Sequence, residues 1–400
     1  MTSTLRPFLV EMPKLLIISD MAHHRIDGGI VGHGATAREI SHLATLFEQV
    51  THVACLHQGS PTQMMLPYAS NRVNFVPVSP SGGKSFLAKA AVLLVASRYV
   101  AAILRELRRL DPETDVVHVR CPAPISLVAI MLLPLIRSPR KRWVKFAGNW
   151  NPSRLDSIAY SFQRWWLRRN FARAKVSMNG TWPDQPRHVT AFVNPSFTRA
   201  ELAEAQEMGA SKTSLSTLRL IFVGQVNKAK GVGRALEIVR RLVDRGLEVR
   251  FEIVGDGPQR GSFEDGAKKL EIQDRVTFRG WLSRSDLAPL MAQAHLMILP
   301  SEGSEGWPKV LSEGMAFGVV PIASNVGSIP QYLREAAVGV ALEARDLNSF
   351  VEAIANYVRY PERWQTETAR ARLAAERFTY EAYLDQVSRL LKLKANSELA

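Results

Sequence analysis

Hydrophobic residues occur in short continuous runs along the first half of the chain, and polar or helical segments separate them. Continuous apolar runs are typical of strands that are buried on both faces of a parallel sheet. They predict strands at 14–19, 50–56, 115–120 and 141–147. Apolar residues at helical spacing predict helices at 35–49 and 84–110. This alternation of strands and helices indicates βαβ units.

The second half of the chain repeats the same rhythm more regularly. Apolar runs predict strands at 218–224, 247–255, 275–280, 295–300 and 319–324. Helical patterns lie between them, at 232–246, 261–272, 283–294 and 308–318. The sequence therefore predicts an α/β fold with a second parallel sheet.

A change of texture separates the two halves. Residues 176–217 are rich in Pro, Gly and small polar residues, which is typical of a domain end and a linker. We therefore expect an N-terminal domain at 1–200, a linker at 201–217 and a C-terminal domain at 218–377. The remaining segment, 378–400, carries a helical pattern long enough to reach another domain. A chain of 400 residues suffices for two such domains.

The charge distribution points to an anionic partner of the first half. The formal net charge is +14, and all of it lies in residues 1–200, because basic and acidic residues balance in the second half. No zinc-finger spacing, RNP-type strand or basic zipper is present, so we expect no nucleic-acid partner. An anionic membrane surface is the other candidate for the basic N-terminal domain.

The segment FQRWWLRRNFARAK, residues 162–175, concentrates this charge among aromatic residues. Trp165, Trp166 and Phe171 alternate with arginines, a composition that suits a helix lying at a lipid interface. The alternative is an ordinary amphipathic helix with its aromatic residues in the core and its arginines in solvent. The composition does not decide between the two.

Targeting signals and cysteines suggest a cytoplasmic protein. The first 20 residues lack the pattern of a secretory signal. The longest apolar stretch, 123–136, contains two prolines and is shorter than the roughly 20 residues that a membrane span needs. Cys55 and Cys121 provide neither a disulfide framework nor a metal-ligand set. We expect a cytoplasmic protein that is soluble or peripheral on the inner face of the plasma membrane.

One block carries the strongest chemical signal. In SEGSEGWPKVLSEGMAFGVVPIAS, residues 301–324, the chain leaves a buried strand, crosses a glycine-containing loop and enters a helix. Such a helix N-terminus lies at the carboxyl edge of the strands, where open α/β sheets bind ligands, and its free N–H groups favour phosphate. Glu305 lies on the loop and Glu313 inside the helix, where each carboxylate can accept hydrogen bonds from sugar hydroxyls. Solvated surface acids are nevertheless the usual fate of such residues.

This block resembles the donor-site motif of the family 4 retaining glycosyltransferases, which belong to the group 1 glycosyltransferases. The similarity extends to LRLIFVGQVNKAKGV, residues 218–232, and to most of residues 251–301. The resemblance implies the GT-B architecture, in which two Rossmann-like domains with parallel sheets face a central cleft. It also implies that the C-terminal helix crosses back to pack on the first domain.

The resemblance also implies roles for individual residues. Glu305 would bind hydroxyls of the transferred sugar, Glu313 the ribose hydroxyls, and Lys230 the diphosphate. Glu305 and Lys230, with Asn149, are the residues we expect to be catalytic. The other expected donor contacts are Gly28, Gly29, Gln225, Arg279, Gly306, Trp307, Pro308, Lys309, Val310 and Leu311.

Three positions depart from the family pattern. Gln225 stands where the family usually has Arg, and Pro308 where it has Gly. Ala147 stands where an active-site His is common. Lys228 or Lys309 would supply the charge missing at Gln225. Residues at strand ends expected to face the cleft, and so to contact the acceptor or compensate for the missing His, are His118, Arg120, Asn149 and Asn151.

The resemblance implies transfer of a hexose from a nucleotide diphosphate-sugar to an acceptor hydroxyl, with retention at the anomeric carbon. We expect no metal and no cofactor, a UDP-sugar donor in preference to a GDP-sugar, and a lipid-linked or cell-surface saccharide as acceptor. Two alternatives remain: a nucleotide-sugar epimerase of the same architecture, and a non-catalytic protein that binds nucleotide-sugar. A dinucleotide oxidoreductase is disfavoured, because no GxGxxG motif follows the first strand.

Overall fold

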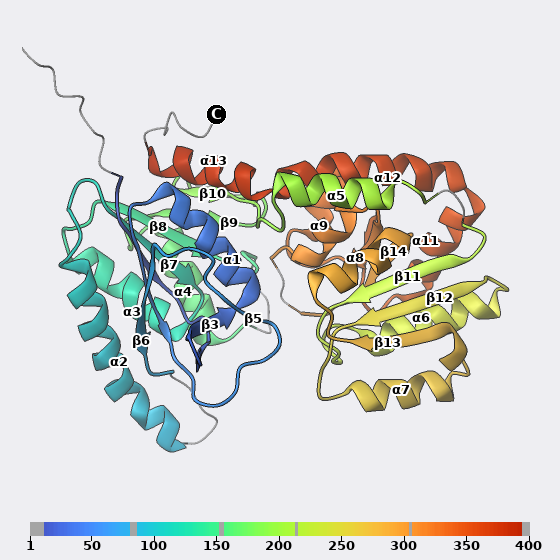
Figure 1. Ribbon diagram of the computed structural model, residues 1–400, viewed down its shortest axis with the longest axis horizontal. Helices are drawn as coiled ribbons and strands as arrows, with labels where there is room; N and C mark the ends of the chain where they lie inside the picture. Colours follow the sequence, from blue (N-terminus) through green and yellow to red (C-terminus); the bar gives the residue numbers. More distant parts are fainter. Residues whose placement is uncertain (1–11, 81–85, 152–155, 213–214, 304–305, 394–400) are drawn as a thin grey trace, which may run out of the picture.

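The computed structural model describes residues 12–80, 86–151, 156–212, 215–303 and 306–393. Two α/β domains lie side by side, and the last helices of the chain run along one side of both (Figure 1). No helix of this described part is long and apolar enough to cross a bilayer.

The N-terminal domain is built on a seven-stranded parallel sheet in the order β10-β9-β8-β7-β1-β4-β6. Its strands are β1 (Leu15–Ile18), β4 (Val50–Cys55), β6 (Val73–Val78), β7 (Val116–Cys121), β8 (Lys141–Phe146), β9 (Lys175–Met178) and β10 (Val189–Ala191). The four strands that continuous apolar runs predicted are confirmed as β1, β4, β7 and β8. The sequence did not predict the shorter or more polar strands β6, β9 and β10.

Helices cover both faces of this sheet. They are α1 (Gly34–Leu43), α2 (Phe86–Leu107), α3 (Pro124–Leu132) and α4 (Ile158–Arg168), with short 3-10 turns η1 (Ala44–Leu46) and η2 (Leu133–Leu135). Residues of β1 alternate between two hydrophobic clusters. Leu16 and Ile18 pack with residues of α2 and α3, whereas Leu15 and Ile17 pack with residues of α1. The period of two along a strand thus joins both layers to one sheet.

A small antiparallel sheet lies beside the large one and was not predicted. It consists of β2 (His23–Ile26), β3 (Gly29–His33) and β5 (Met65–Pro67). Gly29–His33 of the glycine-rich segment 27–34 therefore form a strand that the apolar pattern did not reveal. Gly28, in the turn between β2 and β3, has φ of 92°, a conformation that glycine adopts without steric cost.

The C-terminal domain has a six-stranded parallel sheet in the order β13-β12-β11-β14-β15-β16. Its strands are β11 (Leu218–Val223), β12 (Val249–Val254), β13 (Val276–Gly280), β14 (Leu296–Leu299), β15 (Val320–Ser324) and β16 (Val340–Leu342). All five strands predicted for this half are confirmed. The strand order reverses between β11 and β14, so the ligand-binding switch point of the sheet lies between them.

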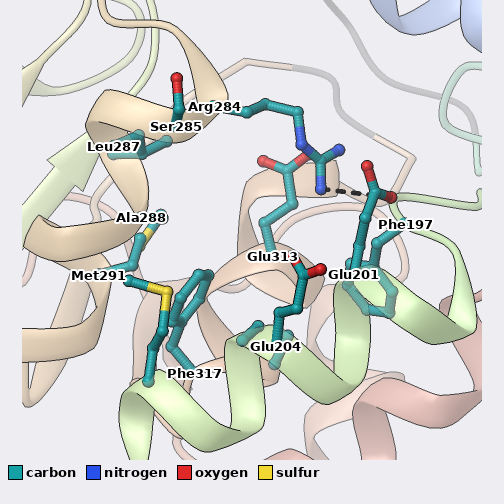
Figure 2. A pocket seen from close by; sticks show the side chains of 13 residues that line it. Phe197, Glu201, Glu204, Arg284, Ser285, Leu287, Ala288, Met291, Glu313 and Phe317 are labelled. Carbon is teal, nitrogen blue, oxygen red and sulfur yellow. Dashed lines mark ion pairs between the residues drawn. The ribbon is translucent and has the colours of Figure 1, made fainter.

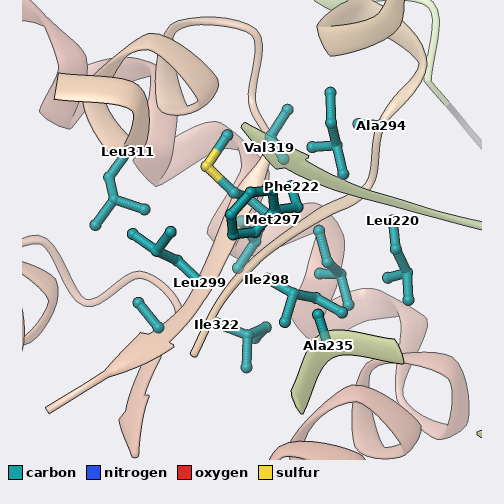
Figure 3. Packing of buried hydrophobic residues seen from close by; sticks show 14 of the residues in the cluster. Leu220, Phe222, Ala235, Ala294, Met297, Ile298, Leu299, Leu311, Val319 and Ile322 are labelled. Atoms are coloured by element: carbon teal, nitrogen blue, oxygen red, sulfur yellow. The ribbon is translucent and has the colours of Figure 1, made fainter. Parts of the chain in front are cut away.

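Helices pack on both faces of this second sheet. They are α6 (Val232–Asp244), α7 (Arg260–Lys269), α8 (Arg284–Gln293), α9 (Lys309–Ala316) and α10 (Ile329–Ala336), with the 3-10 turn η3 (Gln273–Arg275). In the core, Phe222 of β11 and Ala235 of α6 pack with Met297 and Leu299 of β14 (Figure 3). This packing fixes the carboxyl ends of β11 and β14 side by side.

The predicted linker at 201–217 is wrong over its first half. The helix α5 (Arg199–Gly209) occupies it, and Leu202 and Ala205 are buried in the core of the C-terminal domain. Thr198 caps this helix, because its hydroxyl accepts from the Glu201 N–H while the Glu201 carboxylate accepts from the Thr198 N–H. The capping box and two apolar side chains one turn apart make a helix from a segment that looks polar by composition.

The chain crosses back to the N-terminal domain at its end, as expected. After α11 (Leu347–Arg359), α12 (Pro361–Ala375) and the turn η4 (Glu376–Phe378), the helix α13 (Tyr380–Leu391) lies over the N-terminal domain (Figure 1). Tyr383, Val387 and Leu391 join the hydrophobic cluster that also contains Ile40 of α1.

Removing part of this contact should destabilise the protein. Val387 is fully buried, so we expect Val387→Ala to lower the free energy of unfolding by about 2 kcal/mol through two lost carbons and the cavity left behind. Urea unfolding followed by tryptophan fluorescence measures this change. Asp385→Ala, at an exposed position of the same helix, is the control and should change it little. Equal effects of the two substitutions would show that α13 does not pack as described.

Candidate functional site

Two loops meet at the switch point of the C-terminal sheet. The loop after β11 leads into α6, and the loop after β14 leads towards α9. The Glu302 N–H donates to the Ala229 carbonyl at 2.9 Å, which ties one loop to the other. Gly231, with φ of 84°, comes so close to Pro300 that a Cβ atom would lie 2.0 Å from the Pro300 carbonyl oxygen. The structure thus brings the sequence-predicted lysine loop against the loop that leads to Glu305.

Lys230 lies at the entrance of α6. It is half-buried and immediately precedes Gly231, the N-cap of that helix, and its N–H donates to the Asn227 Oδ1 at 2.8 Å. Gln225 is exposed on the same loop, and its Oε1 accepts from the Asn227 amide at 3.0 Å. A lysine ammonium at the start of a 13-residue helix adds its charge to the positive end of the helix dipole.

Glu305 lies outside the described residues, but the chain on either side of it is fixed. Before it, the Glu302 carboxylate pairs with Arg234 at 3.2 Å and with Arg345 at 2.6 Å. After it, the Gly306 carbonyl accepts from the Ser328 hydroxyl at 2.7 Å. Both anchors belong to the C-terminal domain, so the loop is held at the edge of its sheet.

Gly306 is also where the two domains touch. A Cβ atom on Gly306 would lie 2.6 Å from the Asn179 Nδ2 and 2.9 Å from the Ala147 carbonyl oxygen. Ala147 and Asn179 directly follow β8 and β9. The carboxyl ends of these N-terminal strands therefore face the loop between β14 and α9, which we call the donor loop after its expected role. Asn179 is buried, and its Oδ1 has no hydrogen-bond partner among the described residues. Asn179 was not predicted as a site residue, because no motif marks it in the sequence.

The segment from Trp307 to Leu311 points its large side chains inward. Trp307 is buried and stacks on Phe378 at 5.2 Å between ring centroids, while Leu311 lies in the core beside Leu299 (Figure 3). Val310 is half-buried. The sequence predicted that this helix begins at Pro308. Pro308 is instead the N-cap of α9, because the helix begins at Lys309. Only the backbone of this segment is therefore placed to face a ligand at the sheet edge.

Glu313 lines a cavity of about 270 Å³ between α5, α8 and α9. Its carboxylate and the Arg284 guanidinium turn toward one another there (Figure 2). Arg284 is anchored by the Ser196 carbonyl at 2.8 Å and by the Glu201 carboxylate at 3.7 Å. The remaining wall is largely apolar, and it includes Met291. Glu313, predicted to contact a ligand, thus faces a real cavity and is not a solvated surface acid.

The arginine that lines the Glu313 cavity was not predicted, and Arg279, an expected donor contact, has another partner. Arg279 is exposed and pairs with Glu252 of the neighbouring strand β12 at 2.7 Å, an ion pair that raises the pKa of Arg279. Arg284, five residues further on, supplies the guanidinium at the Glu313 cavity. The signal that was overlooked is the position of Arg284 directly after Ser283, the N-cap of α8.

A buried carboxylate joins the domains beside these loops. Glu39 of α1 accepts from Arg120 and Lys145 at 2.7 Å each and from the Tyr383 hydroxyl at 2.9 Å. The Lys309 Nζ, at the start of α9, lies 3.8 Å from the same carboxylate. Burial alone would raise the pKa of Glu39, but the charges of Arg120, Lys145 and Lys309 hold it well below its usual value. Five elements from both domains therefore meet at one charged group.

Comparison with known proteins agrees with this geometry. The family model for glycosyl transferases group 1 matches residues 206–393. The chain is 30% identical over 168 residues to the N-acetyl-α-D-glucosaminyl L-malate synthase of Bacillus anthracis, covering 42% of this chain and 43% of that protein. The second half of the chain is thus similar to the group 1 glycosyltransferases.

Two further matches complete the comparison. The gpi3 subunit of phosphatidylinositol N-acetylglucosaminyltransferase from Schizosaccharomyces pombe is 28% identical over 148 residues, 37% of this chain and 31% of that protein. The chain thus spans less than half the length of both curated relatives. The structure of HepE from Anabaena in complex with UDP superposes with a TM-score of 0.64 and 14% identity, covering 95% of this chain and 100% of that one. This match confirms the predicted GT-B fold.

Two of the predicted donor and cleft residues have other positions or partners. His118 is fully buried in β7 and stacks on Trp143 at 3.6 Å, so its assignment to the acceptor site is wrong. Lys309 points to Glu39, and its Nζ has no hydrogen-bond partner among the described residues. The sequence suggested that Lys309 could supply the charge missing at Gln225. Because its side chain points to Glu39, Lys309 does not do so.

The other predicted residues remain near open surface. Arg120 keeps 15% of its side chain exposed beside Glu39. Asn149 is half-buried after β8, and its Oδ1 accepts from the N–H of exposed Asn151 at 3.0 Å. Gly28 and Gly29 are exposed at the β2–β3 turn, with open space on the Cβ side.

Metal independence stays a prediction for this chain. Within the described ranges, no group of three or more His, Cys, Asp or Glu side chains is placed to hold a metal ion. Cys55 and Cys121 are both buried and unpaired.

Neutralising the central carboxylate should be costly. Glu39→Gln leaves Arg120 and Lys145 buried without their counter-charge, so we expect the free energy of unfolding at pH 7 to fall by roughly 3–5 kcal/mol. Glu106→Gln is the matched control, because Glu106 is equally buried but its partners Arg105 and Arg109 are exposed to water. It should cost less than about 1 kcal/mol in the same urea unfolding experiment. Similar losses in the two variants would contradict the role given to Glu39.

Proposed function

We propose that this glycosyltransferase moves a hexose from a nucleotide diphosphate-sugar to an acceptor hydroxyl, with retention at the anomeric carbon, as in family 4. One observation carries the proposal: two helix N-termini and Lys230 converge at the switch point, and Glu313 faces a cavity beside them. Lys230 and the two helix N-termini would bind the diphosphate, and Glu313 would bind the ribose. A UDP-sugar is favoured over a GDP-sugar, and the UDP in the HepE structure supports this choice.

The chemistry would rest on stabilising the leaving diphosphate. The bond between the anomeric carbon and the diphosphate oxygen breaks with its electron pair going to the diphosphate. The acceptor oxygen forms the new bond on the same face of the sugar, and its proton passes to the leaving phosphate. Lys230 and the N-termini of α6 and α9 would stabilise the developing negative charge without a metal or cofactor.

The two glutamates would divide the recognition of the donor. Glu313, on the second turn of α9, would accept hydrogen bonds from the ribose hydroxyls, and Arg284 would hold its carboxylate in place. Glu305, on the loop before α9, would bind hydroxyls of the transferred sugar. Asn149 and Arg120 would face the acceptor from the carboxyl ends of β8 and β7.

For the acceptor, we propose a lipid-linked or cell-surface saccharide bound at the basic N-terminal domain. Three cations surround the single carboxylate of Glu39 at the domain junction, so this region has a positive excess that suits an acceptor bearing phosphate. The phosphatidylinositol in the name of the gpi3 relative supports a lipid acceptor. The enzyme would then act in the cytoplasm, at the inner face of the plasma membrane.

The donor site can be tested by calorimetric titration with UDP-glucose, UDP and GDP-mannose. Lys230→Ala removes a charged contact to phosphate, worth about 1.5–3 kcal/mol, so we expect UDP-glucose to bind roughly 10- to 100-fold more weakly. Glu313→Gln should weaken binding of UDP-glucose and UDP alike, because the ribose is common to both. Lys269→Ala, on α7 away from the loops, is the control.

Unchanged affinity in the Lys230 and Glu313 variants would refute the site. Release of UDP that depends on an added acceptor would separate a transferase from a protein that only binds the donor. Interconversion of the UDP-sugar without acceptor would instead identify an epimerase.

A further inference from the structure

A second cavity, of about 410 Å³, lies in the N-terminal domain between the start of β8, the start of β9 and the end of α13. Its lining is strongly basic and includes Arg140, Lys141, Arg142, Arg173, Lys175, His188 and Lys392. None of the described residues that line it is acidic. Such a cavity attracts an anion.

This basic cavity is not the donor or acceptor site. It lies at the amino ends of β8 and β9, where Lys141 and Lys175 begin the strands. The carboxyl ends of the same strands lead to Ala147 and Asn179, which touch Gly306 of the donor loop. The six residues of β8 separate the two edges by about 20 Å. The cavity therefore serves a ligand other than the donor.

Among the described residues, no carboxylate forms an ion pair with Arg142, which lines the cavity. Its guanidinium donates to three backbone carbonyls, those of Pro139 at 2.9 Å and of Leu133 and Ile136 at 2.6 Å each. These bonds also fix the segment after α3, on which Leu135 is 79% exposed. One arginine thus supplies positive charge to the cavity and holds an apolar side chain out beside it.

A turn after α4 connects the cavity to exposed aromatic residues. Asn170 and Arg173 have positive φ values, 55° and 49°, and both line the cavity. Phe171, between them, is 41% exposed, and its ring lies 5.4 Å from that of Trp165, which is 46% exposed. Ile158, on the same stripe of α4 as Trp165, is 90% exposed. We call Leu135, Trp165 and Phe171 the apolar rim.

One face of α4 packs into the core through Leu167, but another face exposes large apolar side chains. Gln163 and Arg164 are buried, and Arg164 pairs with Asp156 at 2.8 Å, whereas Ile158 and Trp165 face outward. The reading that places the aromatic residues of 162–175 in the core is therefore wrong for Trp165 and Phe171. Trp166 is half-buried, and its indole N–H donates to the Ile130 carbonyl at 3.1 Å. An outward apolar stripe beside a basic cavity indicates a surface for a partner that is both anionic and apolar.

We propose that the basic cavity binds the phosphate of an acidic phospholipid while the apolar rim enters the interfacial layer of the same bilayer. Tryptophan and phenylalanine flanked by arginines are the side chains that interfacial binding favours. A bilayer explains both features, because its phosphates are anionic and its interfacial layer accepts apolar side chains. A protein partner would have no general reason to match both the cavity and the rim. The inference deepens the membrane attachment in the proposed function, yet it does not depend on donor binding or transfer.

Cosedimentation with vesicles tests the proposal. We expect the full chain to bind vesicles of phosphatidylcholine with 30% phosphatidylglycerol at least tenfold more tightly than vesicles of phosphatidylcholine alone. Arg173→Glu with Lys175→Glu should abolish this preference. The matched control, Lys269→Glu with Arg334→Glu, makes the same charge change on the C-terminal domain and should bind like the unmodified protein.

The apolar rim has its own variant. Trp165→Ala with Phe171→Ala keeps every charge and should weaken binding to the anionic vesicles about tenfold. The single variant Lys175→Gln is milder and should weaken it about fivefold, which keeps the test valid if the double variants do not fold. UDP-glucose binding, measured without vesicles, should be unchanged in each folded variant.

Three results would overturn the proposal: equal binding to both vesicle types, equal binding by the cavity and control variants, or occupation of the cavity by inorganic phosphate with no binding to vesicles. If the unmodified protein binds anionic vesicles but does not bind UDP-glucose, the proposed function is contradicted and this inference still holds.

Discussion

The buried carboxylate of Glu39 is the interaction on which the arrangement of the two domains depends. It lies on α1, yet its partners come from β7, β8, α13 and α9, so it joins the N-terminal sheet to the returning helix and to the donor helix. Without this carboxylate, Arg120, Lys145 and Lys309 would repel one another. Burial already lowers the pKa of Lys145 to about 7 even with Glu39 present. The relative position of the two domains therefore depends on the negative charge of Glu39.

Close backbone contact forms the donor edge around this anchor. Gly231 touches Pro300 within the C-terminal domain, and Gly306 touches Ala147 and Asn179 across the cleft. A side chain at either glycine would push the loops or the domains apart. Large side chains such as Trp307 turn into the core instead and leave the backbone at the surface. Under the proposed function, donor recognition would depend on this close packing as much as on the charged residues.

The sequence predicted most of the fold, because strands buried on both faces appear as continuous apolar runs whatever their neighbours. Sequence-based prediction failed for side chains whose positions depend on residues far away in the sequence. His118 looked like a strand-end residue, but the register of β7 turns it onto Trp143. The partners of Glu39 are 81, 106 and 344 residues away from it, so no local pattern could reveal them. The outward face of α4 likewise required the helix phase, which composition alone does not contain.

We propose that the edge between β11 and β14 binds a nucleotide diphosphate through Lys230, the starts of α6 and α9, and Glu313. A crystal structure with bound UDP would decide this. We expect the diphosphate at the two helix starts within hydrogen-bond reach of Lys230, and both ribose hydroxyls on Glu313. UDP bound elsewhere, for example in the basic cavity at the opposite edge of the N-terminal sheet, would contradict it.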